Sequence, residues 1–298
     1  MSKKNIPIKP NETYTLTIRD LGIHGEGIGA VDDFTVFVPG ALPGETIQAM
    51  IVTAKKSYAT GRLISIETAS AHRTTPACPV CHACGGCQIS HLTYEGQLAV
   101  KERRVKDVMV RIGGCEESLV RPIAGASRPW NYRNKMAVPV SQVTSGPVLG
   151  YYRQGSHQVI PIASCAIQEE ENNRLLRFAQ GFMTRHQLTG YNEKTGRGSV
   201  RHIMGRVGDH GEVMAVIVTA SGKLPLADLW VSEMRKLLPE VVSIYHNVQS
   251  HKGNAILGKE IHHLWGKKTL TSSPLRPRLR SLPLLLLSGT QTAGRAPL

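Results

Sequence analysis

Four of the six cysteines of the chain fall within one short segment, at Cys78, Cys81, Cys84 and Cys87. A fifth, Cys165, stands alone much further along the chain. Three thiolates at short spacing plus one distant thiolate are typical ligands of a four-iron cluster, in which each iron takes one sulfur from the protein. The glycines that separate Cys84 from Cys87 would let the backbone turn tightly beside the inorganic core. The spacing therefore favours an iron–sulfur cluster.

Two other interpretations of these cysteines stay open. Structural zinc sites usually combine two short ligand pairs separated by a longer insert, and four cysteines at intervals of three in one loop fit that pattern less well. Unligated redox thiols are the third interpretation. A disulfide scaffold is disfavoured, because the cytoplasm keeps thiols reduced.

The composition is that of a globular protein. The 298 residues suffice for two or three domains, and the 41% apolar and 19% charged fractions are ordinary. No apolar run reaches the roughly 18 residues that a spanning helix needs, and no apolar segment follows the lysines near Met1. We therefore expect a cytoplasmic protein with no signal peptide and no membrane partner.

The formal net charge of +14 is unevenly distributed along the chain. Residues 1–70 carry equal numbers of basic and acidic side chains, whereas residues 71–200 carry sixteen bases and nine acids. A basic middle section suits an anionic partner such as RNA, although a solvated basic surface has the same composition.

Candidate RNA contacts lie in this basic middle section. Arg133 and Lys135 are two residues apart on an expected strand, so they share one face of it. Asn134 lies between them, and Arg153 lies near the end of another expected strand. We predict that these four residues contact RNA, with ordinary exposed strand charges as the alternative.

The first seventy residues predict short strands. Apolar and polar residues alternate over 14–18, 34–38 and 47–51, which is typical of half-buried strands. Turn-rich stretches separate them, 21–30 with four glycines and 39–44 with two prolines and two glycines. This pattern predicts an all-β barrel of the OB type.

A helix and then a mixed domain are expected beyond the cysteines. The helix spans 92–112, with apolar residues at helical spacing, basic residues on the other face and Gly113-Gly114 at its end. Strands are expected over 132–140, 148–153, 158–162, 199–207, 213–220, 241–247 and 254–257, with helices over 168–186 and 226–238. Few helices among many strands predict an α+β domain with a largely antiparallel sheet.

Several motifs occur together in the order typical of one family. They are the Val38–Glu45 stretch, the Cys-x5-Cys-x2-Cys spacing of Cys78, Cys84 and Cys87 followed by Gln88, the isolated Cys165, and the segments Trp130–Met136, Val200–His202, Asn247–Gln249 and Asn254–Gly258. On these motifs, which cover residues 7–268, the chain resembles the bacterial RNA uracil-5-methyltransferases with an N-terminal TRAM domain.

This resemblance implies a multi-domain organisation and a cofactor. The expected parts are a TRAM-like β-barrel (7–68), an iron–sulfur loop (69–91), an amphipathic helix (92–114), an α+β central RNA-binding domain (115–268) and an unrelated tail (269–298). The resemblance also implies a 4Fe–4S cluster on Cys78, Cys84, Cys87 and Cys165, with Cys81 as a bystander. The family forms 5-methyluridine from S-adenosylmethionine, which implies RNA, and 23S ribosomal RNA in particular, as the partner. No obligate protein partner is implied.

The resemblance ends near residue 268. The family continues into a Rossmann-like domain with an S-adenosylmethionine loop, a nucleophilic cysteine and a general-base glutamate, whereas residues 269–298 contain neither cysteine nor glutamate. We therefore expect a disordered or frame-shifted tail, no catalytic or cofactor-binding residues, and no methyl transfer by this chain. Cys115 lies outside the cluster region, but its place at a helix end disfavours a nucleophilic thiolate.

The same resemblance predicts that the helix at 92–112 lacks its usual cover, because in the family it packs largely against the catalytic domain. Two other functions also fit the residues. A non-enzymatic RNA-binding adaptor would use the barrel and a metal-stabilised module, and an iron–sulfur redox protein would use the cluster itself. The surrounding DNA sequence would discriminate the adaptor from the methyltransferase. A flavin site or a second cluster motif would favour the redox protein, and the sequence has neither.

Overall fold

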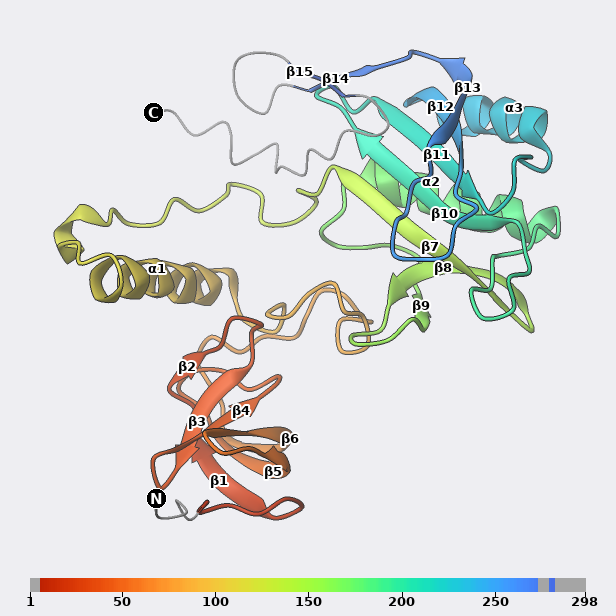
Figure 1. Cartoon of the computed structure of the whole chain (residues 1–298). Helices are drawn as coiled ribbons and strands as arrows, with labels where there is room; N and C mark the ends of the chain where they lie inside the picture. Colours follow the sequence, from red (N-terminus) through yellow and green to blue (C-terminus); the bar gives the residue numbers. More distant parts are fainter. Residues whose placement is uncertain (1–5, 273–278, 282–298) are drawn as a thin grey trace. The chain divides into compact units, whose positions relative to one another are not determined.

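The computed structural model describes residues 6–272 and 279–281 of the chain (Figure 1). The chain divides into two compact units. The first consists of residues 1–81 and 87–125, and the second of residues 82–86 and 126–298. In the described ranges, every helix is too short or too polar to cross a membrane.

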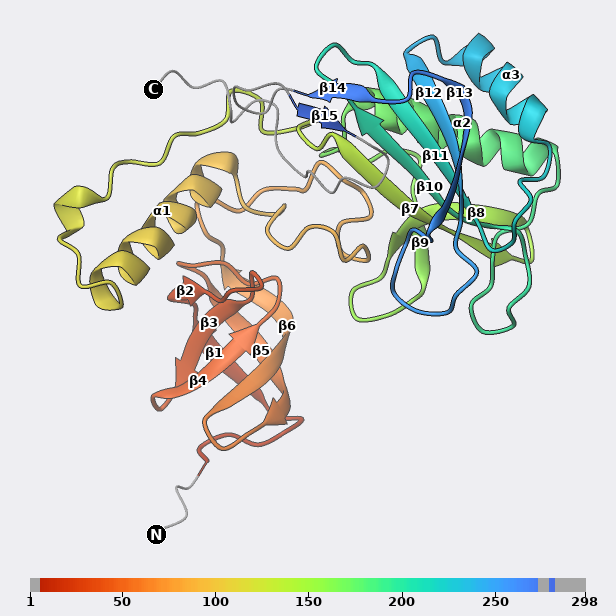
Figure 2. The same cartoon turned by 45° about the horizontal axis from the view of Figure 1, so that its top comes forward.

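The first unit contains a six-stranded sheet whose strands curl around a common core (Figure 2). In spatial order the strands are β1 (Thr13–Thr17), β5 (Thr46–Ala54), β6 (Tyr58–Thr68), β4 (Phe34–Val38), β3 (Gly27–Val31) and β2 (Asp20–Leu21). Neighbours run antiparallel, except that β4 and β6 are parallel. The expected β-rich N-terminal fold is thereby confirmed.

Alternating apolar positions form the core of this sheet. Leu16, Val36 and Ile47, which the alternation placed inward, are buried in one cluster. The glycine-rich stretch over 21–30 contains the expected turn, which joins β2 to β3, and its last residues, from Gly27, belong to β3. A Cβ at Gly27 would lie 2.8 Å from the backbone oxygen of Ala41, so this glycine permits close packing of a strand.

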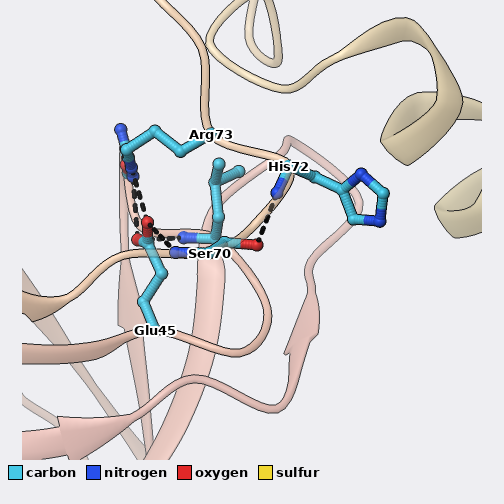
Figure 3. Close-up of polar contacts among 6 residues, drawn as sticks. Glu45, Ser70, His72 and Arg73 are labelled. Carbon is cyan, nitrogen blue, oxygen red and sulfur yellow. Dashed lines mark hydrogen bonds and ion pairs between the residues drawn. The ribbon is translucent and has the colours of Figure 1, made fainter.

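A buried ion pair ties the sheet to the segment that leads into the cysteines (Figure 3). The carboxylate of Glu45 is fully buried and accepts hydrogen bonds from Arg73 Nη2 at 2.8 Å and from the N–H groups of Leu42 at 2.8 Å and Ser70 at 3.2 Å. Arg73 also donates to the Gly40 carbonyl at 2.7 Å. Burial raises the pKa of Glu45, but Arg73 and the two N–H groups outweigh burial and hold the pKa below its ordinary value.

Helix α1 (Tyr94–Arg111) lies close to its expected range. Thr93 caps its start by accepting a hydrogen bond from the N–H of Gly96, and Gly114, with φ of +65°, follows its end. The later part of its apolar stripe is exposed, with Val105 51% and Ile112 82% exposed, whereas Tyr94 and Leu98 are half-buried. A short 3-10 helix, η1 (Glu117–Leu119), follows α1.

The second unit contains a seven-stranded sheet with two helices packed on it (Figure 2). In spatial order the strands are β13 (Glu260–Gly266), β12 (Val241–Val248), β11 (Val213–Thr219), β10 (Val200–Val207), β7 (Lys135–Val143), β8 (Gly146–Tyr152) and β9 (Val159–Pro161). The helices are α2 (Glu170–Arg185) and α3 (Ala227–Leu237). Phe182 of α2 and Trp230 of α3 are fully buried in the shared core. The expected mixture of many strands and few helices is confirmed.

The sheet is largely antiparallel, as expected, with β11 and β12 as its one parallel pair of neighbours among the described strands. Parallel neighbours need a crossover connection, which α3 supplies. The strand expected over 254–257 does not form, because the side chain of Gln249 donates to the carbonyls of Ala255 and Leu257 at 3.0 and 3.1 Å. The last strand of the sheet, β13, begins at Glu260.

The first residues of the expected tail are packed. Strand β14 (Leu270–Ser272) pairs antiparallel with β15 (Leu279–Ser281), and Leu270 is buried beside Met204 and Tyr245. The prediction of a disordered tail from residue 269 is therefore wrong at its start, because Leu270 joins an apolar cluster on the sheet. The remainder of the tail, 273–278 and 282–298, lies outside the described residues.

Candidate metal-binding loop and RNA-binding surface

The cysteine loop is closed at its base by backbone pairing within the first unit. Residues 72–74 lie antiparallel to residues 91–93, with N–H···O distances of 2.8 and 2.9 Å at the two ends of the pairing. Arg73 in this stem also binds Glu45, so the stem is fastened to the six-stranded sheet (Figure 3). The loop that carries the four clustered cysteines therefore starts and ends on a rigid base.

The middle of the cysteine loop belongs to the second unit. The N–H of Gly85 donates to the Tyr152 carbonyl at 2.9 Å, and Cys84 pairs with Arg153 in an isolated β-bridge. The Cys84 Sγ accepts a hydrogen bond from the N–H of Gly86 at 3.4 Å. An N–H group that donates to sulfur stabilises a thiolate and tunes an iron–sulfur cluster bound to it.

One buried asparagine fixes the backbone of the distant cysteine. Asn173 of α2 accepts the N–H of Cys165 through Oδ1 at 2.8 Å and donates from Nδ2 to the Cys165 carbonyl at 3.2 Å. The N–H of Gln168 donates to the same carbonyl at 3.1 Å. Asparagine is a poor helix former, so its presence in the first turn of α2 is explained by its contact with Cys165.

The phenol of Tyr151 lies near both Cys84 and Cys165. Burial raises the pKa of Tyr151, and the nearby Cys165 and Cys84 sulfurs raise the pKa further when they are charged. The Tyr151 oxygen accepts a hydrogen bond from Gln168 Nε2 at 3.0 Å. Within the second unit, two predicted ligands, Cys84 of the loop and the distant Cys165, thus lie near the side chain of Tyr151.

The six cysteines all lie in the described ranges, where each is half-buried and none forms a disulfide bond. Cys78, Cys81 and Cys87 belong to the first unit, and Cys84 and Cys165 to the second. Over residues 6–272 and 279–281, no three His, Cys, Asp or Glu side chains gather closely enough to hold a metal ion. The thiols themselves suit a cluster, because they are outside disulfide bonds and only half-buried, and because Cys84 has an N–H donor at its sulfur.

Three basic residues of the second unit form a group that we call the basic strand cluster: Arg133, Lys135 and Arg206. Lys135 on β7 lies directly opposite Arg206 on β10 in the sheet register. Burial lowers the pKa of Lys135, and the positive charges of Arg206 and Arg133 lower it further. Arg133 is exposed and Lys135 is half-buried, whereas Arg206 is only 8% exposed, so Arg133 and Lys135 are the two that can reach RNA. Like charges held this close together favour a polyanionic partner. The sequence predicted two of the three residues, but not Arg206.

The other two predicted RNA contacts lie elsewhere. Asn134 is only 6% exposed, and its carbonyl accepts hydrogen bonds from the N–H of Val207 at 2.8 Å and Asn172 Nδ2 at 3.2 Å. A residue this buried has little surface to offer RNA, so the structure gives the predicted contact at Asn134 no support. Arg153 is exposed and pairs through its backbone with Cys84, so it lies at the cysteine loop.

The structure also reveals supporting residues that the sequence analysis missed. Tyr151, Gln168 and Asn173 hold or surround the predicted cysteine ligands, and all three lie within the second unit. Their sequence signal is weak. Two consecutive asparagines at the start of an expected helix are unusual and could have marked Asn173, whereas nothing in the local sequence marks Tyr151.

The comparisons with known proteins begin with the N-terminal sheet. The family model of the TRAM domain matches residues 7–64, which include β1 to β5 and the first part of β6. The first unit therefore contains a TRAM domain.

Over most of its length the chain is homologous to RNA methyltransferases. It is 41% identical over 268 residues to an uncharacterized RNA methyltransferase of Bacillus cereus, a match that covers 90% of this chain and 58% of that protein. It is 40% identical over 266 residues to one of Clostridium tetani, with 89% and 58% covered. The chain thus spans 58% of the length of these relatives.

A solved structure shares the fold. The chain matches the crystal structure of Pyrococcus abyssi tRNA (uracil-54, C5)-methyltransferase in complex with S-adenosyl-L-homocysteine with a TM-score of 0.71 and 21% sequence identity. The match covers 94% of this chain and 62% of that chain. At this identity the likeness establishes the fold.

Proposed function

We propose that this chain is the RNA-binding N-terminal and central part of an S-adenosylmethionine-dependent RNA methyltransferase that forms 5-methyluridine. The observation that carries this proposal is the homology to RNA methyltransferases over 90% of the chain. The TRAM domain and the basic strand cluster support RNA as the partner. The shared fold with a tRNA (uracil-54, C5)-methyltransferase supports carbon 5 of uracil as the methylated atom. The RNA we propose is 23S ribosomal RNA.

We further propose that Cys78, Cys84, Cys87 and Cys165 hold a 4Fe–4S cluster. Their spacing supports this ligand set, as do the N–H donor at the Cys84 sulfur and the asparagine that fixes the backbone of Cys165. A cluster bound here would be a structural element, with the four thiolates as its protein ligands. Cys81 stays outside the proposed ligand set.

Methyl transfer to carbon 5 of uracil needs a cysteine thiolate that adds to carbon 6 of the ring. Cys115, which lies outside both the cysteine loop and the proposed ligand set, is poorly placed for this step. It follows the carboxyl end of α1, and its Sγ contacts the Gly113 carbonyl at 3.7 Å. Activated thiols are typically found at the amino end of a helix or beside a base, whereas Cys115 follows the carboxyl end of one. We therefore propose that the 298-residue chain by itself binds RNA without transferring a methyl group.

The double variant Arg133→Ala with Lys135→Ala is expected to weaken binding to a 23S ribosomal RNA fragment by at least about tenfold. Each charge-assisted contact to a phosphate contributes about 1.5 kcal/mol or more, and about 1.4 kcal/mol is a factor of ten. Fluorescence anisotropy with labelled RNA at low salt measures the change.

The matched control removes two positive charges elsewhere in the same unit. Lys223 and Lys236 are both exposed and lie outside the basic strand cluster. The control variant Lys223→Ala with Lys236→Ala should bind RNA within about twofold of the wild type, apart from the small loss of net charge. Equal losses in the two double variants would mean that the basic strand cluster has no special part in RNA binding.

A further inference from the structure

The second unit has a pocket of about 240 Å³ that the proposed function does not yet use. Aromatic rings, a buried arginine and a buried histidine line it, namely Tyr152, His157, Tyr191, Arg201 and His202. Sites for drug-sized ligands have volumes of roughly 300–1,000 Å³. The smaller volume here suits a single ring system.

A β-bulge directs two consecutive polar side chains to this pocket. The register between β10 and β11 shifts between Val200 and His202, so Arg201 is the extra residue. Consecutive residues of a regular strand point to opposite faces, whereas Arg201 and His202 both line the pocket. Bulges commonly re-aim side chains beside binding sites. The two side chains are only 3% and 8% exposed.

Arg201 presents an unused donor. Its Nη1 donates to the carbonyls of Gln249 at 2.7 Å and His251 at 2.8 Å, and its guanidinium lies 4.6 Å from the centre of the Tyr191 ring. The buried Nε has no protein acceptor. Leaving a buried donor unpaired costs about 1–3 kcal/mol. A ligand with a hydrogen-bond acceptor at this point would recover that cost.

His202 adds a second unused polar atom. Its Nδ1 is buried and has no protein partner. Burial and the charge of Arg201 lower the pKa of His202 to about 4, so the imidazole is neutral near pH 7. A neutral imidazole has one donor and one acceptor nitrogen. Together with Arg201 it matches the mixed donor and acceptor edge of a nucleobase.

Aromatic rings in the pocket offer a surface on which a nucleobase can stack. Tyr152 and Tyr191 are half-buried, and the Tyr152 ring lies 5.4 Å from that of His157. Bases of single-stranded RNA stack on aromatic side chains, and each stacked base contributes about 1–3 kcal/mol. Paired bases in a duplex cannot enter a pocket of this kind.

We propose that this pocket binds one unpaired nucleobase of RNA, stacked on its tyrosines with the polar edge toward Arg201 and His202. The inference rests on the proposed function, which it deepens by naming a base-binding subsite. His202 and Arg206 lie on the same face of β10, four residues or about 13 Å apart. RNA whose base fills the pocket can therefore extend its phosphates toward the basic strand cluster.

The variant Tyr191→Leu tests the pocket, because it removes the ring and keeps apolar bulk. We expect its affinity for a short single-stranded RNA to fall about five- to hundredfold, the equivalent of one lost stacking contact. Affinity for a fully paired duplex of the same length should stay within about twofold of the wild type. The matched variant Tyr191→Phe keeps the ring and should bind both RNAs like the wild type.

Equal losses for the two RNAs, or no loss for either, overturn the base-binding subsite and leave the proposed function standing. A wild-type chain that binds neither RNA overturns both. Photocrosslinking with 5-iodouridine RNA, read by mass spectrometry on the wild-type chain, decides the matter if Tyr191→Leu fails to fold. Crosslinks at Tyr152 or Tyr191 are expected, and crosslinks confined to other parts of the chain overturn the subsite.

Discussion

Replacing Cys84 or Cys165 by serine is expected to remove most of the iron from the anaerobically purified chain and to bleach its brown colour. A wild-type chain with a 4Fe–4S cluster carries about four irons, each bound to one thiolate. A serine hydroxyl is protonated at neutral pH and replaces a thiolate poorly. Iron analysis and the visible absorption spectrum measure the loss.

Two cysteines serve as matched controls for this experiment. Cys81 lies in the same loop and Cys115 follows α1, and neither belongs to the proposed ligand set. The variants Cys81→Ser and Cys115→Ser should keep the wild-type iron content and colour. A colourless wild-type chain with one zinc per molecule would refute the cluster, and iron loss in Cys81→Ser would change the ligand set.

The variant Glu45→Ala is expected to destabilise the first unit by about 3 kcal/mol. It leaves the Arg73 guanidinium without its partner and deprives two backbone N–H groups of their acceptor. Removing one member of a buried ion pair costs about 3–5 kcal/mol, and the partial exposure of Arg73 places this case at the low end. An exposed carboxylate on the same sheet, Glu67, is the control, and Glu67→Ala should change stability by less than about 0.5 kcal/mol.

The contribution of the Glu45 carboxylate to the stability of the first unit also depends on pH. Its pKa in the folded chain lies below the ordinary value of 4.5, so the unfolded chain binds the proton more tightly. The stabilisation is therefore fully present above about pH 4.5 and is lost as the pH falls through the lower folded-state pKa. The variant Glu45→Gln should lose this pH dependence.

Hydrogen exchange read by mass spectrometry distinguishes destabilisation of the first unit by Glu45→Ala from any change in the second unit. Peptides from β4 to β6 should exchange faster in Glu45→Ala, because exchange from core strands reports the stability of their unit. The three tryptophans, Trp130, Trp230 and Trp265, all belong to the second unit. Tryptophan fluorescence should therefore show an unchanged unfolding midpoint for that unit. Unchanged exchange in β4 to β6 would mean that Glu45 is dispensable.

Local sequence patterns predicted much of the fold. Period-two alternation identified the buried faces of β1, β4 and β5, because the side chains of a strand point alternately to its two sides. The helical spacing and the glycines after Arg111 placed α1 within two residues of its ends. Both patterns depend on residues that are close together in the sequence, so they can be recognised without knowledge of the tertiary structure.

Such local patterns could not predict which distant segments of the chain pair with one another. Arg206 joins Arg133 and Lys135 only through the register of β10 with β7, and Arg201 turns toward the pocket only through the bulge beside β11. The electrostatic influence of Cys84 and Cys165 on the pKa of Tyr151 likewise depends on three separate segments of the chain. Sequence spacing carries no information on these registers.

The exposed end of the α1 stripe agrees with the prediction, whereas the packing of Leu270 does not agree with a disordered start of the tail. Val105 and Ile112 are exposed because the residues around α1 leave that side of the helix open. Leu270 was assigned to a structureless segment on composition alone, but it covers Met204 and Tyr245 on the sheet. A single apolar residue in a polar segment can be fixed by a distant cluster, and composition does not reveal this.

The salt dependence of RNA binding by the wild-type chain tests the central proposal most directly. Binding to a single-stranded 23S ribosomal RNA fragment is measured from low to physiological salt, and the logarithm of the affinity is plotted against the logarithm of the salt concentration. We expect a straight line with a slope of about −1.4, since Arg133 and Lys135, the two members of the cluster that are not buried, each neutralise one phosphate and contribute about −0.7 apiece. A slope near zero, or no binding at low salt, would contradict RNA binding through the basic strand cluster.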